Sequence, residues 1–195
     1  MIVARQQVVS FADLYAGKIV AALDRQHPRD LFDVRDLLAN EGIGDELRNA
    51  FIVYLLSHPR PMSEVLTARP KDIAREFEQN FQGMTTEPVE LAELLAARTA
   101  LVDAIVGKMP DGHRRFLISF ERGSPDWSLL DIKKVDKLPA VKWRQQNLDK
   151  ITKNKRAELV AQLERVLGMD VTPSQLTLMP EKSKPSKPAR KRKSK

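Results

Sequence analysis

The sequence predicts a mainly α-helical bundle preceded by one short strand. From Ser10 onward, apolar residues recur at three- and four-residue spacings along most of the chain, which is the helical period. Short stretches such as "NEGIGD" and "HPRP" divide this pattern into segments of helical length. Only residues 2–9, "IVARQQVV", alternate weakly and are rich in β-branched side chains, as a strand would be.

The first two helices have the clearest start signals. Ser10 followed by Asp13 predicts a helix start before "FADLYAGKIVAALDRQ". Pro28 suits the first turn of a second helix, which we expect to end near Leu38, because the missing N–H of proline is not needed there. Further helices are expected at residues 46–57, 70–81, 88–108 and 112–122, and one or two more within 138–168.

The strand and the two ends of the chain define the expected domains. A single strand is not stable alone, and the rest of the chain supplies no second convincing one. We therefore expect residues 1–9 to be an orphan strand of a larger sheet, residues 10–168 to form the helical domain, and residues 169–195 to be a disordered basic tail.

The net charge of +7 arises in the tail. Residues 181–195 hold eight Lys or Arg and one Glu, whereas residues 1–180 carry 25 basic and 25 acidic side chains. Such a tail could bind nucleic-acid phosphates or serve only solubility. The absence of cysteine excludes disulfides and thiolate sites. We see no signal peptide and no membrane-spanning run, so we expect a cytoplasmic protein without membrane contact.

Paired charges cluster in the stretch "KIVAALDRQHPRDLFDVRDLL". Lys18 and Arg25 are seven residues apart and share a helix face, as do Asp30 and Asp33, which are three apart. Arg29 lies four residues before Asp33. If the two helices fold back on each other, Lys18 can approach Asp33 across the hairpin.

Two interpretations of this cluster remain open. Phosphoryl transfer needs cations that hold a polyphosphate and a carboxylate that orients the attacking hydroxyl. Alternatively, the same side chains form interhelical ion pairs that only support the fold. Spacing alone does not separate the two.

The stretch "SFADLYAGKIVAALDRQHPRDLFDVRDLL" resembles the lysine- and aspartate-bearing motifs of the AbiEii/AbiGii toxin family, which are nucleotidyltransferase-like toxins of bacterial toxin–antitoxin and phage-defence (abortive-infection) systems. Later segments, "HRRFLISFERGSPDWSLL" and "LPAVKWRQQNLDKI", resemble the C-terminal helical region of that family. The resemblance covers residues 1 to about 152.

The resemblance implies a polymerase-β-like nucleotidyltransferase and assigns roles to the charged cluster. Lys18 would contact nucleotide phosphates and Asp33 would be catalytic, while Arg25, Arg29 and Asp30 would complete the nucleotide-binding pocket. It also implies tRNA as a candidate acceptor, an antitoxin encoded nearby as a partner, and Mg²⁺ and a nucleoside triphosphate as cofactors, the last two only if the N-terminal half of the family is supplied.

One family feature is missing from the sequence. The family carries a Gly-Ser motif followed by an Asp-x-Asp metal pair, and neither occurs before Lys18; Gly123-Ser124 lies in a predicted turn far downstream. Two carboxylates, Asp30 and Asp33, are a poor metal site, so we predict no metal ligand in this chain. We expect the chain to be the C-terminal portion of such a toxin, truncated or split from a separate N-terminal half, with residues 2–9 as the last strand of that sheet.

Other candidate residues carry weaker signals. His27, His58 and His113 lie in separate segments, so we expect no histidine metal site. Trp127 and Trp143 are expected to be packing residues between helices.

Two alternatives to a toxin remain. The chain could be a noncatalytic helical nucleic-acid-binding module that uses the basic tail, or a degenerate product that does not fold stably.

Overall fold

The computed structural model describes residues 8–169, and in this range the chain forms helices and no strand. The sequence-based prediction of a mainly helical fold is therefore confirmed. In chain order the elements are α1 (Phe11–Asp24), α2 (Pro28–Asn40), α3 (Asp45–Leu56), α4 (Met62–Thr67), α5 (Ala74–Asn80), α6 (Leu91–Val102), the π-helical turn η1 (Asp103–Gly107), α7 (Asp111–Glu121), the short 3₁₀ turns η2 (Trp127–Leu129) and η3 (Val135–Lys137), α8 (Pro139–Lys150) and α9 (Lys153–Val166).

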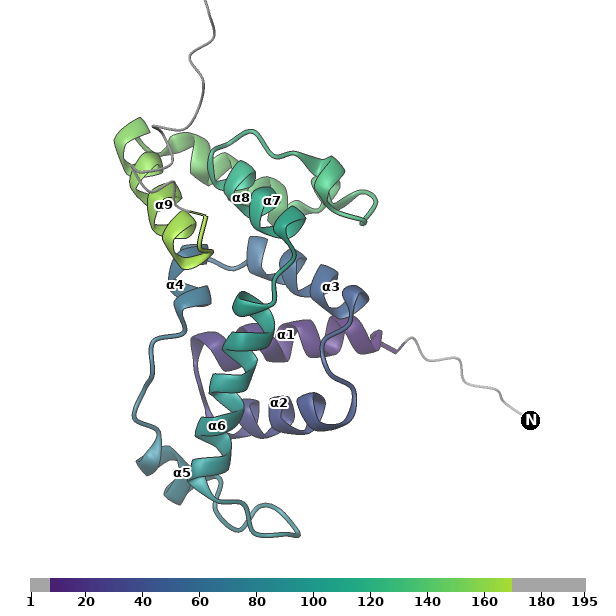
Figure 1. Cartoon of the computed structure of the whole chain (residues 1–195), viewed down its shortest axis with the longest axis vertical. Helices are drawn as coiled ribbons and strands as arrows, with labels where there is room; N and C mark the ends of the chain where they lie inside the picture. Colours follow the sequence, from purple (N-terminus) through teal and green to yellow (C-terminus); the bar gives the residue numbers. More distant parts are fainter. Residues whose placement is uncertain (1–7, 170–195) are drawn as a thin grey trace, which may run out of the picture.

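The helices form two groups along the long axis of the molecule (Figure 1). In the first group α1 packs against α3 and α2, and α6 crosses both α1 and α2. In the second group α7 packs against α9, with α8 beside them. The short helix α4 lies between the groups and contacts both α1 and α9. The end of α1 is thereby brought near α4, while α2 contacts α5.

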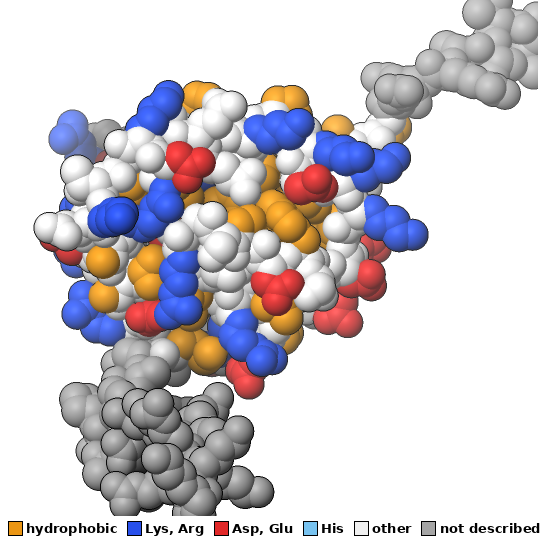
Figure 2. Space-filling model, turned by 90° about the horizontal axis from the view of Figure 1, so that it is seen from above, with side chains coloured by type: hydrophobic (Ala, Val, Ile, Leu, Met, Phe, Trp, Pro, Cys, Tyr) orange, Lys and Arg blue, Asp and Glu red, His pale blue; other side chains and the backbone are white. Residues whose placement is uncertain are grey.

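One continuous hydrophobic core runs through both groups. Its largest fully buried side chains include Leu23 and Leu31 of the first two helices, Phe51 of α3, and Phe116 and Phe120 of α7. Figure 2 views the molecule from the end that carries α7, α8 and α9, where Lys and Arg side chains surround a more hydrophobic centre. None of the helices within residues 8–169 is both long enough and apolar enough to cross a bilayer.

The helix starts at Ser10 and Pro28 agree with the prediction, whereas the His27 cap of α2 was not predicted. The Ser10 hydroxyl accepts a hydrogen bond from the Asp13 N–H, 3.1 Å away, and thereby caps α1. His27 caps α2, because its Nδ1 accepts from the Arg29 N–H at 3.2 Å, and Pro28 occupies the first turn. These two caps fix where each helix begins.

The structure has one helix that was not predicted, and two predicted helices begin later than expected. Helix α4 was not expected, and the helix predicted at 70–81 begins only at Ala74. The Asp72 carboxylate accepts from the Ala74 N–H at 3.1 Å in the turn ahead of this helix, whose cap residue, Ile73, has no capping side chain. The helix predicted at 88–108 begins at Leu91, where Glu90 and Glu93 form a reciprocal capping box, and it ends in η1.

The predicted strand at residues 2–9 falls almost entirely outside the described residues, as does the basic tail, so the three-part domain division stays a prediction. Val8 and Val9, which are described, are exposed and have no regular structure. Trp127 packs as predicted, with its ring centroid 5.4 Å from that of Phe116. The prediction for Trp143 was wrong, because it is 54% exposed on α8.

Candidate functional site

Lys18 of α1 and Asp33 of α2 face each other across the helical hairpin. The Lys18 Nζ lies 2.9 Å from Asp33 Oδ2, and the two side chains are 30% and 37% exposed. The same Nζ lies 5.3 Å from the centre of the Tyr15 ring, whose negative face also favours a cation. The approach predicted from spacing is confirmed, and both charged groups remain open to solvent.

Arg25 and Asp30 form a second pair at the bend between the helices. Arg25 Nη2 donates to Asp30 Oδ1 at 2.9 Å, with the arginine side chain 65% exposed and the aspartate only 13%. Asp30 lies in the first turn of α2, where the helix dipole favours a negative charge. Its second oxygen, Oδ2, is buried without a hydrogen-bond partner among the described residues. This oxygen could therefore accept a further donor.

Arg29 bonds to residues at and after the end of α5 and to none of the other predicted site residues. Its Nη2 donates to the Asn80 carbonyl at 3.4 Å and contacts the Met84 sulfur at 3.3 Å. It therefore tethers the start of α2 to the end of α5 rather than joining Asp33, four residues later in the same helix.

A pocket of about 420 Å³ lies beside the bend, and three of the five predicted site residues line it. Arg25, Arg29 and Asp30 line it, together with Lys71 and Glu76. Lys18 and Asp33 do not line this pocket. The structure thus divides the predicted site into an ion pair on the hairpin and a pocket at the bend.

Gln26 holds the bend in place. Its backbone is left-handed, with φ of 57°, and its side chain is 1% exposed. The side-chain amide donates to the Arg69 carbonyl at 2.8 Å, and its oxygen accepts from the Lys71 N–H at 3.1 Å and from Arg98 Nη1 at 3.3 Å. A strained residue with all of these partners fixes the loop at residues 69–71 against the hairpin.

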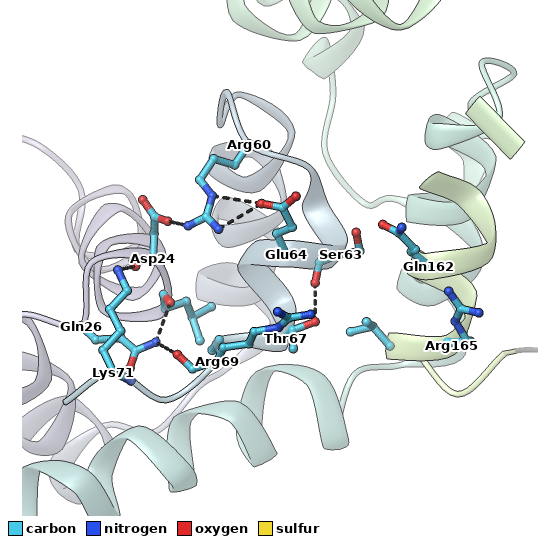
Figure 3. Close-up of a pocket in the computed structure, with 13 residues that line it drawn as sticks. Asp24, Gln26, Arg60, Ser63, Glu64, Thr67, Arg69, Lys71, Gln162 and Arg165 are labelled. Atoms are coloured by element: carbon cyan, nitrogen blue, oxygen red, sulfur yellow. Dashed lines mark hydrogen bonds and ion pairs between the residues drawn. The ribbon is translucent and has the colours of Figure 1, made fainter. Parts of the chain in front are cut away.

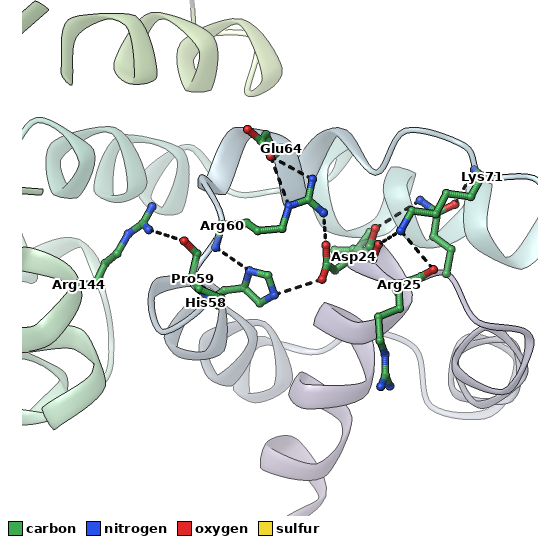
Figure 4. Close-up of polar contacts among 10 residues, drawn as sticks. Asp24, Arg25, His58, Pro59, Arg60, Glu64, Lys71 and Arg144 are labelled. Carbon is green, nitrogen blue, oxygen red and sulfur yellow. Dashed lines mark hydrogen bonds and ion pairs between the residues drawn. The ribbon is translucent and has the colours of Figure 1, made fainter. Parts of the chain in front are cut away.

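The last residue of α1, Asp24, gathers a second set of charges (Figure 4). Its carboxylate accepts from Arg60, which also pairs with Glu64 at 3.0 Å. These bonds to Glu64 and Asp24 raise the pKa of Arg60. Asp24 Oδ2 lies 3.5 Å from His58 Nε2, and Lys71 Nζ donates to the Asp24 carbonyl at 2.7 Å. The negative end of α1 is thereby covered by cations.

The donor set does not fit a metal ion. Among residues 8–169 no three His, Cys, Asp or Glu side chains are grouped as metal ligands. Asp33 is held by Lys18, and Asp30 by Arg25. A hard divalent cation needs several oxygen ligands in a defined geometry, which these two carboxylates do not supply.

The sequence does not reveal Asp24, Gln26 and Arg60 as residues of this region. The partners of Asp24 and Gln26 are 36 and 43 residues away, so no helical spacing reveals them. The signal that could have pointed to Gln26 is its place between Arg25 and the His-Pro start of α2, where the chain must turn sharply.

Comparison with known proteins gives one match. The family model described as "Nucleotidyl transferase AbiEii toxin, Type IV TA system" matches residues 2–147, about three quarters of the 195-residue chain. The match contains both charged pairs of the hairpin and ends within α8. No curated protein and no solved structure matches significantly.

Proposed function

The chain belongs to the AbiEii family of nucleotidyl transferase toxins of type IV toxin–antitoxin systems, and from this premise we propose that its α1–α2 hairpin handles the nucleotide and its acceptor in a nucleotidyl transfer reaction. The observation that carries the proposal is the Lys18–Asp33 pair, which lies in the matched region, spans two helices and stays accessible to solvent.

Lys18 and Asp33 have complementary roles in this proposal. An exposed lysine can leave its carboxylate partner for a phosphate oxygen, because the oxygens of both anions accept charge-assisted hydrogen bonds. Asp33, released from Lys18 or still beside it, can accept a hydrogen bond from the hydroxyl that attacks the nucleotide. The pair would thus hold the two reactants next to each other.

Arg25, Arg29 and Asp30 would form the nucleotide pocket at the bend. The Arg25 side chain is 65% exposed and can bind a phosphate, while Asp30 Oδ1 accepts from it at the pocket wall. The predicted Mg²⁺ would need carboxylates besides Asp30 and Asp33, so we derive no step from a metal.

The acceptor and partner follow from the same premise. A type IV toxin implies a cognate antitoxin, and we propose tRNA as the acceptor. That a separate N-terminal half completes the enzyme, and that the system defends against phage, stay predictions. The tail lies outside residues 8–169, so the alternative of a nucleic-acid-binding module also stays a prediction.

A growth assay tests the proposal in cells. In an active form of the toxin, with the N-terminal half supplied, we expect induced expression to arrest growth and both Lys18→Met and Asp33→Asn to relieve the arrest at equal protein level. Lys108→Met is the matched control. Lys108 lies away from the hairpin and forms an exposed ion pair with Asp103, with Nζ 3.0 Å from Oδ2. Arrest that persists undiminished in both hairpin variants would contradict the site.

A further inference from the structure

We propose that a second pocket, between the end of α1, α4 and α9, binds a phosphate group of a nucleotide or of a nucleic-acid strand. The pocket has a volume of about 600 Å³, which is in the range of small-molecule sites. Neither Lys18 nor Asp33 lines it, so this inference goes beyond the function proposed for the hairpin.

The charge of the pocket walls favours an anion. Four cationic side chains line the pocket, against two carboxylates. Both carboxylates, Asp24 and Glu64, are already engaged by Arg60. Arg69 and Arg165 make no ion pair with any residue in the range 8–169. Their charges remain available to a ligand.

The two arginines come from different walls. Figure 3 shows Arg69 at the end of α4 and Arg165 across the pocket on α9, with the Gln162 amide beside it. Lys71 is the third cation of this set. Its ammonium group donates to the Asp24 and Arg25 carbonyls, which leaves the third of its three donors for a ligand. Guanidinium groups offer paired N–H donors that match phosphate oxygens.

The loop that carries Arg69 and Lys71 is held rigidly. Ala68 ends α4 in a left-handed conformation, with φ of 42°, and the buried Gln26 side chain then bonds the Arg69 carbonyl and the Lys71 N–H. Gln26 and Ala68 are both strained non-glycine residues, and both line the pocket. Backbone strain of this kind concentrates at functional sites because it places side chains in advance of binding.

The experiment measures binding of two probes to the full chain. Pyrophosphate, followed by calorimetry, represents a free nucleotide phosphate, and a short fluorescent single-stranded RNA, followed by anisotropy, represents a strand. The test variant is Arg69→Gln/Arg165→Gln. The control is Arg75→Gln/Arg115→Gln, which removes the same charge from two exposed arginines elsewhere and leaves the tail unchanged.

We expect the test variant to bind at least one probe about tenfold more weakly than the control does, because two charge-assisted contacts are lost. Weaker binding of pyrophosphate assigns the site to free phosphates, and weaker binding of RNA alone assigns it to a nucleic-acid strand. Equal binding of both probes by the test and control variants would overturn the proposal, as would a wild-type chain that binds neither.

A second variant guards against misfolding. Gln162→Glu adds a carboxylate to an exposed position of α9 and keeps a good helix former, so the fold should be retained while phosphate binding weakens. Lys108→Met lies outside this pocket and outside the hairpin and should bind both probes as the wild type does. Because Arg69→Gln/Arg165→Gln keeps Lys18 and Asp33, weaker binding by this variant reports on the pocket, whereas the growth assay of the Lys18 and Asp33 variants reports on the hairpin.

Discussion

Lys18 Nζ and Asp33 Oδ2 lie 2.9 Å apart, although the two residues belong to different helices and neither side chain is buried. An ion pair exposed in this way contributes only about 0–1 kcal/mol to stability. A structural role would therefore give the pair little effect on the fold, whereas a role in nucleotide handling makes it essential to activity. This difference separates the two interpretations that the sequence leaves open.

The stability of the pair is measured by a double-mutant cycle. Lys18→Met, Asp33→Asn and the double variant should show a coupling free energy of about 0.5 kcal/mol in urea unfolding, which decreases as salt is added. A coupling of several kcal/mol would instead identify the pair as a main support of the hairpin.

Gln26 should matter for stability far more than Lys18 does. Gln26→Ala leaves the Lys71 N–H and the Arg69 carbonyl without their buried partner and keeps a left-handed backbone, so we expect a loss of about 2 kcal/mol in unfolding free energy. Gln146→Ala, at an exposed position of α8, serves as the control and should change stability by less than about 0.5 kcal/mol. Equal effects of the two substitutions in thermal or urea unfolding would contradict the role of Gln26.

The buried Glu121 gives the fold a pH dependence. Burial raises the pKa of Glu121, which is 1% exposed and has neither carboxylate oxygen hydrogen-bonded, although Arg144 and Arg156 lower it in part. Above pH 4.5, the ordinary pKa of this group, the unfolded chain releases a proton that the folded protein keeps. Between pH 4.5 and the raised pKa of the folded protein, the unfolding free energy therefore falls as the pH rises.

Glu121→Gln removes the proton release and should stabilise the protein at neutral pH by about 1 kcal/mol, with little effect near pH 4. The measurement is the melting temperature of both proteins across this range, with the exposed Glu78→Gln as control. A Glu121→Gln variant that is less stable than the wild type at pH 7 would show that the two arginines outweigh burial.

Local signals explain which parts of the structure could be predicted. Ser10, Asp13 and Pro28 mark helix starts within a few residues, and the heptad between Lys18 and Arg25 places both on one face. The Lys18–Asp33 contact was predicted from these signals on the condition that the two helices fold back on each other, which they do. The contacts of Asp24 with Arg60, and of Gln26 with Arg69 and Lys71, could not be predicted. They join α1 and the bend to the loops that flank α4, and the position of α4 depends on tertiary packing against α1 and α9.

The most direct test of the central claim is transfer of a labelled nucleotide. Purified chain, magnesium, each labelled nucleoside triphosphate and total tRNA are incubated together, with Lys18→Met, Asp33→Asn and Lys108→Met in parallel. With a family N-terminal half that carries the Asp-x-Asp pair added to the mixture, the account predicts labelled RNA with the wild type and with Lys108→Met, and a reduction of about 100-fold or more with either hairpin variant. Transfer that is undiminished in both hairpin variants would contradict it.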